Sequence, residues 1–368
     1  MARLPYRALA VLALALALLT AVVPAGAAPP DPQTNGSAAR ALAWMRTQQQ
    51  PDGGFPGFGA GSTADAVYAI VAAGDRPAAF VSGGNTPYAF LAAKATDLAK
   101  TPGGAAKVLL ALYAGELGPG GVHSFGGVDL LQAITSKLDP ATGHYGADVT
   151  GHALAILAQR AVGAPIDPRA VDWLVSAQGP EGGWAFGGDK SPGAADTNTT
   201  ALVLQALAVS GPAANQAAVT HALAYLHGQQ NADGGFPYAQ SDPNGSASDA
   251  NSTASVVLGL TALCQDPAGA AWTKGGHSAV AALAAFQNAS GAFRYQTAQP
   301  DDNAGATYQA TQALIEAPLP GLTPGGGCAF TTPAPGMPAT GQPQWPLLPV
   351  GAGLALAVAG LVLRRRRA

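Results

Sequence analysis

The chain has 368 residues, of which 11% are charged and 48% are hydrophobic, a composition typical of packed domains and not of disordered segments. Without the six arginines near its two ends, 12 basic residues face 21 acidic ones, a net charge of about −9. A nucleic-acid-binding surface needs basic stripes that neutralise phosphates, so a nucleic-acid partner is excluded.

The first 27 residues have the order of an export signal. Two arginines precede an apolar run over residues 8–23, and residues 25–27 supply the small side chains of a cleavage site. We expect a signal peptide over residues 1–27, a mature start at Ala28 and a short linker over residues 28–35. The alternative is an uncleaved membrane helix, which the short apolar run disfavours.

Residues 36–319 repeat the same pattern six times. A short motif, usually built on a threonine, opens an apolar helical segment, and the copies follow each other at intervals of 42–54 residues. Periods of this length, with one apolar helix per copy, predict a helical repeat architecture. The reference residues of the six units are Thr63, Ala105, Thr150, Thr200, Thr253 and Thr307.

A second helix and a glycine-containing corner complete most units. We expect these helices over residues 40–50, 170–178, 219–230 and 278–287. Each ends near a glutamine that lies six residues before an aromatic, and glycine, which adopts positive φ, stands in between. The pairs are Gln49 and Phe55, Gln178 and Trp184, Gln230 and Phe236, and Gln287 and Phe293. Six such units predict an all-α fold, an α6/α6 toroid whose reference helices form the inner ring and start at the same end.

The corner loops of the last three units are long and lie at the same place in each unit, which predicts a common rim. Each has a second aromatic residue two positions after the first, and acidic residues follow. An acidic and aromatic rim suits a planar or hydroxylated ligand. The candidate ligand-binding residues are Asp148, Phe186, Asp196, Asn198, Tyr238, Asp249, Asn251, Tyr295 and Asp302.

A structural interpretation of the same residues stays open. Asp and Asn are good helix N-caps, so Asp196, Asp249, Asn198 and Asn251 would then only begin their helices. The aromatics would brace long loops. We interpret His144 and His152, beside the third inner helix, as structural histidines.

Two cysteines, Cys264 and Cys328, would meet an oxidising exterior after export. A disulfide between them would close a long loop and stabilise the fold by about 4 kcal/mol in the chain-entropy model. The sequence leaves open whether they lie close together.

The segment after residue 319 has the features of a membrane anchor. Residues 320–344 are rich in Gly and Pro and predict a tether. Residues 345–363 carry no charge and are long enough to cross a bilayer, and residues 364–368 form a basic tail that we expect on the cytoplasmic side. The domain is therefore expected on the extracellular face of the cell envelope.

The tether also contains Met-Pro-Ala-Thr-Gly over residues 337–341. This resembles the cell-wall sorting signal of sortase substrates. The resemblance implies a sortase as partner, cleavage between Thr340 and Gly341, and attachment to the cell envelope. Met337 departs from the usual leucine, and without cleavage the segment remains a transmembrane anchor.

The corner motif Gln-x-x-x-Gly-Gly-Phe/Trp, followed by Asp-x-Asn-x-Thr-Ala, resembles the terpenoid cyclase/prenyltransferase toroid superfamily over residues 36–319. The resemblance implies the α6/α6 toroid fold. It leaves function open, because the superfamily includes terpene cyclases, protein prenyltransferases, thioester domains and cobalamin carriers.

The catalytic branches of this superfamily need motifs that do not occur here. Class II cyclases protonate their substrate with the middle Asp of Asp-x-Asp-Asp, and Asn198 and Asn251 stand at that position. Cys264 has no partners for the zinc site of prenyltransferases. The thioester motif does not occur, and no facing carboxylate pair marks a glycoside hydrolase. We therefore predict no catalytic residue and no metal site.

The remaining branch is ligand carriage. The unit motifs resemble bacterial relatives of the intrinsic factor and transcobalamin toroid, which implies a non-catalytic carrier anchored at the cell surface and a cobalamin or other small molecule as its ligand. Those carriers add a β-domain, whereas a tether follows Pro320, so a separate β-domain partner is expected. Two alternatives are an exported terpene-cyclase-like or glycan-acting enzyme that uses the ring cavity, and a surface interaction module without a small ligand.

The export signal makes a direct prediction. N-terminal sequencing of the protein isolated from intact cells should give Ala28 as the first residue, because signal peptidase cleaves after small residues. A mature protein that begins at Met1, or a toroid recovered from the cytosol, would contradict it.

Overall fold

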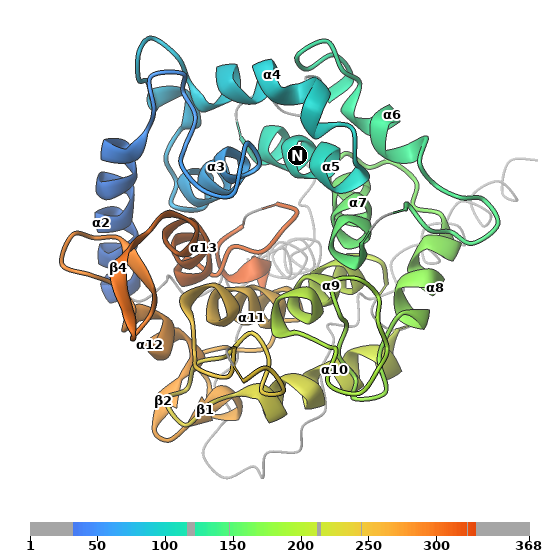
Figure 1. The fold of residues 1–368 in the computed structure, drawn as a ribbon, viewed down its shortest axis with the longest axis vertical. Helices are drawn as coiled ribbons and strands as arrows, with labels where there is room; N and C mark the ends of the chain where they lie inside the picture. The colour runs from blue at the N-terminus through green and yellow to red at the C-terminus, as the bar shows by residue number, and fades with distance from the viewer. Residues whose placement is uncertain are drawn as a thin grey trace, which may run out of the picture. The chain divides into compact units, whose positions relative to one another are not determined.

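The computed structural model describes residues 32–115, 122–146, 148–211, 215–243, 245–321 and 323–328, which lie in one compact unit. The described part contains twelve α-helices, which alternate between an inner and an outer ring (Figure 1). The inner helices are α3 (Ser62–Ala72), α5 (Pro102–Ala114), α7 (Val149–Ala161), α9 (Thr197–Val209), α11 (Ala250–Ala262) and α13 (Ala304–Leu314). The outer helices are α2 (Pro32–Gln48), α4 (Pro87–Leu98), α6 (Leu130–Thr135), α8 (Pro168–Ser176), α10 (Gln216–Gln229) and α12 (Ala279–Ala284).

The inner helices form a closed ring. Each packs against the inner helix of the next unit, and α13 packs against α3, so the last unit meets the first. The predicted α6/α6 toroid is therefore confirmed, with the reference residues on the inner helices. The helix expected over residues 278–287 is shorter, because the residues after α12 form the turn that carries Gln287.

Short elements that the sequence did not predict fill the loops. Two antiparallel hairpins precede α12 and α13. Their strands are β1 (Thr273–Lys274) with β2 (His277–Ser278), and β3 (Phe293–Gln296) with β4 (Gln299–Asn303). The 3-10 turns are η1 (Pro77–Ala79), η3 (Ala270–Trp272) and η4 (Pro324–Gly327).

The inner helices are apolar on almost all sides, as expected of helices that are packed both by their neighbours and by an outer ring. In α9, for example, nine of the 13 residues are buried. In five of the inner helices the N-cap residue has a side-chain oxygen that accepts the backbone amide hydrogen of the residue three positions later. This bond satisfies one of the amides of the first turn that have no partner within the helix. These N-caps are Thr101, Asp148, Asp196, Asp249 and Asn303.

The reference threonine joins each inner helix to the corner of its own unit. In four units its hydroxyl oxygen accepts a hydrogen bond of 2.9–3.0 Å from the backbone amide of the motif aromatic. The four residues, Thr63, Thr200, Thr253 and Thr307, are fully buried. Because the same bond recurs at the start of each helix, these inner helices begin at the same end of the ring, as predicted.

The motif glutamine joins one unit to the next. The side-chain amide of Gln178 donates to the carbonyl of Gly182 in its own corner (2.7 Å) and to that of Ala218 in the next outer helix (2.8 Å). Gln230 donates in the same way to Gly234 in its own corner (3.0 Å) and to Trp272 in η3 of the next unit (2.9 Å). We call this pair of hydrogen bonds the glutamine bridge.

The first glycine of these corners is required because the backbone of the next unit lies directly against it. Gly182 has a φ of +92°, and a Cβ atom there would lie 2.4 Å from the backbone oxygen of His221 in the next unit. Gly234 meets His277 in the same way, at 2.3 Å. Any side chain would therefore separate neighbouring units and strain the turn.

A glutamine bridge also closes the ring. The side-chain amide of Gln287 in the last unit donates to the carbonyls of Gly291 (2.9 Å) and of Ser37 in the first outer helix (2.8 Å). Beside it, the rings of Phe55 and Tyr308 meet edge to face with centroids 6.0 Å apart. The two ends of the repeat are therefore joined by the interaction that joins its interior units.

Packing of the toroid continues past residue 319, where the sequence analysis begins the tether. The amide of Leu319 donates to the side-chain oxygen of Gln205 on α9, at 2.9 Å. Cys328 is buried and forms a disulfide with Cys264, which follows α11. The sequence had left this pairing open. The segment therefore lies against the C-terminal halves of α9 and α11.

The terminal segments lie outside the described residues. These include the predicted signal peptide, the span over residues 345–363, and Thr340 and Gly341. Of the helices that the structure describes, none is long and apolar enough to cross a membrane.

The glutamine bridge can be tested with two adjacent residues. Gln49 donates to Gly53 and Phe80 at 3.1 Å each, whereas Gln50 is exposed. We expect Gln49→Ala to lower the free energy of unfolding by about 1–2 kcal/mol, because two carbonyls lose their partner. The matched control Gln50→Ala should change it by less than about 0.5 kcal/mol in urea denaturation. Equal losses in the two variants would refute the role of the bridge.

Candidate functional site

The predicted acidic residues of the rim begin inner helices. One carboxylate oxygen of Asp148, Asp196 and Asp249 accepts an amide hydrogen at 2.6–2.7 Å. Asp196 and Asp249 are each only 1% exposed. The structural interpretation is therefore confirmed for Asp196 and Asp249. It is wrong for Asn198 and Asn251, which are the second residues of α9 and α11 and cap neither helix.

The three predicted aromatics lie along one arc of the same rim. The carbonyls of Phe186 and Tyr238 accept the first amides of α7 and α9, from Val149 and Thr197, at 2.9 Å. Tyr295 lies beside the start of α11, since its neighbour Gln296 pairs with Asp249, the N-cap of that helix. The loop of each unit thus covers the start of the preceding inner helix.

These aromatic side chains are accessible. Phe186 is 55% exposed, Tyr238 is 38% exposed, and Tyr295 is half-buried. They therefore do not belong to the interhelical core, and the arc expected from their common spacing exists. Their role in binding remains a prediction.

Burial changes the acidity of the rim. It raises the pKa of Asp249 to about 6, against hydrogen bonds from Ser252 that lower it. Burial also raises the pKa of Asp196, whose carboxylate accepts hydrogen bonds from Thr199, from the amide of Phe186 and from the hydroxyl of Tyr238. The pKa of Tyr238 rises to about 12, through burial and the charge of Asp196. These carboxyl groups serve their own helices and are shielded from a ligand.

The remaining candidates lie in two places. Asn251 donates from its side-chain amide to Gln309 on α13 at 2.8 Å, and Asn198 also lies on its inner helix, half-buried. Asp302 is exposed on β4 and accepts hydrogen bonds from Asn288 and Ser290, both at 2.8 Å. Asp302 therefore lies one residue before the N-cap of α13, with its carboxylate held by its own corner.

A second surface, which the sequence analysis missed, lies inside the ring. On each inner helix or its first turn, half-buried residues occur at two positions four residues apart. Such residues lie one above the other on the same side of a helix. Since outer helices cover the opposite side, this side points to the ring axis. We call it the inner face, and it consists of Gly61 and Asp65, Gly103 and Lys107, Thr150 and Leu154, Asn198 and Leu202, Asn251 and Ser255, and Gly305 and Gln309.

One ion pair stands out on the inner face. The ammonium group of Lys107 on α5 lies 2.6 Å from Oδ2 of Asp65 on α3, and both side chains are partly accessible, at 28% and 22%. Burial raises the pKa of Asp65, and Lys107 opposes this shift. The hydroxyl of Tyr68 donates to the backbone carbonyl of Lys107 at 2.6 Å. Two charges in otherwise apolar helices were the sequence signal for this pair.

The third unit has a different corner. The place of the reference threonine is taken by His152, two residues after the expected Thr150, and the same histidine makes the bond to the next unit that a glutamine makes elsewhere. Nδ1 of His152 accepts the amide of Tyr145 (3.3 Å), and its Nε2 donates to the carbonyl of Ala170 in the next outer helix (2.8 Å). The ring also packs on Trp173, with centroids 4.5 Å apart. Since one nitrogen accepts and the other donates, the imidazole is neutral. Burial lowers the pKa of His152 to about 4.

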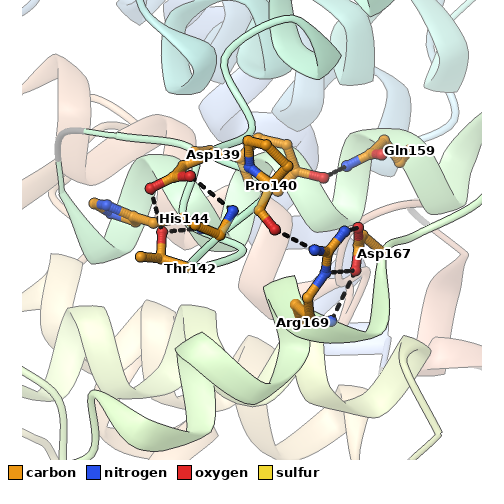
Figure 2. Close-up of polar contacts among 9 residues, drawn as sticks. Asp139, Pro140, Thr142, His144, Gln159, Asp167 and Arg169 are labelled. Carbon is orange, nitrogen blue, oxygen red and sulfur yellow. Dashed lines mark hydrogen bonds and ion pairs between the residues drawn. The ribbon is translucent and has the colours of Figure 1, made fainter.

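Asp139 takes the sequence position of the glutamine in this corner (Figure 2). Its carboxylate accepts from the amide of Ala141 and the hydroxyl of Thr142, both at 2.8 Å, so it stays within the loop. Arg169 on α8, the next outer helix, is held by Asp167 and donates a hydrogen bond to the carbonyl of Pro140 in this corner. His144, stacked on Trp173 at 3.9 Å, completes the corner. The two histidines are structural, as expected.

No group of three or more His, Cys, Asp or Glu side chains that could hold a metal ion is found in the segments that the structure describes. The outer surface has a groove of about 480 Å³ between the corners of the fourth and fifth units. Its polar groups include Glu181, Gln229 and Gln240, and Ala224 lies in its wall.

The chain is similar to terpene cyclases in sequence. Residues 131–301, from α6 to β4, match the family model of the squalene-hopene cyclase C-terminal domain. A drimenyl diphosphate synthase from Streptantibioticus cattleyicolor is 30% identical over an alignment of 158 residues, which covers 38% of this chain and 28% of that protein. The match therefore spans less than a third of that relative.

Solved structures share the fold. The type II terpene cyclase MstE from Scytonema aligns with a TM-score of 0.55 and 16% identity, over 77% of this chain and 98% of that one. A glycosidase in complex with glucose aligns with a TM-score of 0.50 and 14% identity, over 79% and 98%. At these identities the likeness concerns the fold alone. The predicted toroid of the terpenoid cyclase/prenyltransferase superfamily is confirmed.

The prediction of a non-catalytic, cobalamin-type carrier is wrong. Both sequence matches are to terpene cyclases, and they support the enzyme that was the alternative. That prediction considered an acidic residue at only one sequence position, the middle Asp of Asp-x-Asp-Asp. Asn198 and Asn251 do occupy that position on the inner face, but the face also contains a carboxyl group one helical turn deeper, on α3.

The neutral histidine of the third unit predicts acid sensitivity. The folded pKa of His152 is about 4 against 6.5 when unfolded, so the unfolded chain binds more protons between these values. Stability is then complete above pH 6.5 and falls as the pH decreases toward 4. We expect this group to account for a loss of about 3 kcal/mol. Urea unfolding at pH 7 and pH 4 should show that loss in the wild type and not in His152→Gln.

His123, which is largely exposed beside Asp129, provides the control. His123→Gln should keep the pH dependence of the wild type. If the loss persists undiminished in His152→Gln, the acid sensitivity has another origin.

Proposed function

We propose that this protein is a terpene-cyclase-like enzyme that folds an isoprenoid substrate against the inner face and converts it into a cyclic isomer. The match of residues 131–301 to the squalene-hopene cyclase domain carries the proposal. The matched stretch includes α7, α9 and α11, which contribute half of the inner helices. The drimenyl diphosphate synthase relative supports the same reaction class.

The chemistry of the inner face suits a hydrocarbon with a small polar end. On α7 and α9 the face contains Leu154 and Leu202, which offer apolar contact to an isoprenoid chain. On α11 and α13 it contains the hydrogen-bonded amides of Asn251 and Gln309, which suit an oxygen atom of the substrate. A folded polyene held in this way would meet its reacting carbons in fixed order.

The accessible arc of Phe186, Tyr238 and Tyr295 stands where the inner helices begin, which is also the end at which the inner face lies. We propose that these rings guide an apolar substrate toward the inner face. Aromatic faces attract both hydrocarbon and cationic groups. Substitution of Tyr238 by alanine would then weaken substrate capture more than it would change the chemical step.

The proposed site of action is the outer surface of the cell. The export signal, the apolar span over residues 345–363 and the sorting-like motif at Thr340 and Gly341 support this location. Sortase attachment or membrane anchoring would hold the toroid near the envelope lipids, from which isoprenoids are drawn.

Turnover of isoprenoids tests the proposal. The mature protein should convert farnesol, geranylgeraniol, their diphosphates or squalene into a product of unchanged mass with fewer double bonds, detected by gas chromatography and mass spectrometry. Leu202→Trp fills the inner face and should lower turnover by at least about tenfold, since added bulk displaces the substrate. Ala224→Trp, in the outer groove, is the matched control and should leave turnover unchanged.

Two results would contradict the proposal. One is hydrolysis of a glycan by the same protein without conversion of any isoprenoid, which would favour the glycan-acting alternative. The other is isoprenoid conversion that responds to Ala224→Trp and not to Leu202→Trp, which would move the reaction away from the inner face.

A further inference from the structure

The inner face contains only one carboxyl group among the residues that the structure describes. It belongs to Asp65, in the first turn of α3 and four residues after Gly61. We propose that Asp65 donates the proton that starts cyclisation and that Lys107 is its positioning residue. This assignment rests on the proposed function and adds to it the acid, which is not at the usual place for this superfamily.

The other carboxyl groups near the inner helices are not placed for this task. Asp196 and Asp249 are 1% exposed, and backbone amides of their own helices occupy their oxygens. The exposed carboxylate of Asp302 is not part of the inner face and accepts hydrogen bonds from Asn288 and Ser290 in its own corner. Asp65 differs in both respects, because its side chain is 22% exposed and no backbone amide of α3 is bonded to it.

The contacts of Asp65 prepare it to donate. Lys107 occupies Oδ2 at 2.6 Å, which leaves Oδ1 as the oxygen that carries the proton. Lys107 is itself fixed, because the hydroxyl of Tyr68 donates to its backbone carbonyl. When the proton leaves, the ammonium group stabilises the carboxylate that forms, and such prearranged charge lowers the barrier of a charge-forming step.

Burial favours the protonated form that the reaction needs. It raises the pKa of Asp65, while the charge of Lys107 works in the opposite direction. The other titratable groups that interact with Asp65 are Tyr68, on the same helix, and Tyr308, on α13. Both are neutral phenols, whose own pKa burial raises, so among the described residues Lys107 is the one charged group that acts on this carboxyl.

The proposed step balances as an isomerisation. The O–H bond of Asp65 breaks, a C–H bond forms at one carbon of a double bond, and the positive charge appears on the other carbon. A second double bond attacks this cation and forms the ring carbon–carbon bond. The resulting cation loses a proton from an adjacent carbon to water, which forms the new double bond, and water returns a proton to the Asp65 carboxylate. No oxidant or reductant is needed.

The first test replaces the acid by its isostere. Asp65→Asn keeps the size of the side chain but cannot supply a strong-acid proton, so kcat should fall by about 10²–10⁴-fold. The melting temperature and the dissociation constant for the substrate should stay close to those of the wild type. Asp97→Asn, on the exposed surface of α4 beside Lys100, is the control and should retain full turnover.

The second test distinguishes a positioning role of Lys107 from a purely structural role. Turnover needs protonated Asp65, so kcat should fall as pH rises through the pKa of that carboxyl. Lys107→Met removes the charge that lowers this pKa. The falling limb of the profile should therefore move to higher pH while the maximal rate decreases. If Lys107 is only structural, Lys107→Met should reduce the yield of folded protein and leave the falling limb of the profile at the same pH.

The outcomes distinguish the two proposals. If the wild type converts no isoprenoid, the proposed function fails, and the assignment of Asp65 fails with it. If the wild type converts an isoprenoid and Asp65→Asn does so at a similar rate, the function stands and the assignment is overturned. A large loss in Asp65→Asn, together with the shifted limb in Lys107→Met, supports both.

Discussion

The toroid depends on a glutamine side-chain amide that, in four of its corners, joins its own turn to the next unit. The amide of Gln230 supplies two hydrogens to two buried carbonyls, and a backbone turn alone provides neither. The glycine that follows has to approach the next unit closely, and the reference threonine then aligns the inner helix with the corner. Fold, ring closure and the position of the inner face all follow from this repeated geometry.

The sequence revealed these features because they are local. A glutamine six residues before an aromatic, with glycine between them, is visible in a single unit, and four of the units have the threonine that bonds to this aromatic. The rim was also predictable, because Phe186, Tyr238 and Tyr295 follow their corners by the same spacing. The inner face was not. Asp65 and Lys107 lie 42 residues apart, and their contact depends on how two apolar helices are rotated against each other.

The third unit shows how the same geometry is reached with other chemistry. His152 combines the acceptor of a threonine and the donor of a glutamine in one neutral ring. The spacing of the corner is kept, since Asp139 precedes Tyr145 by the same six residues. The sequence pattern shows a missing glutamine here, whereas the structure shows that a residue on the inner helix makes the glutamine's bond to the next unit as well as the threonine's bond to the corner.

The bond between Gln287 and Ser37 has a consequence for how such a protein ends. A linear array of helical repeats exposes an apolar face at each end and needs special capping repeats with polar outer surfaces. In this chain the first and last units cap each other, so all six can keep the same interior sequence. The cost is kinetic: residues 250 positions apart must meet before either end is covered, and contacts of such long range slow folding.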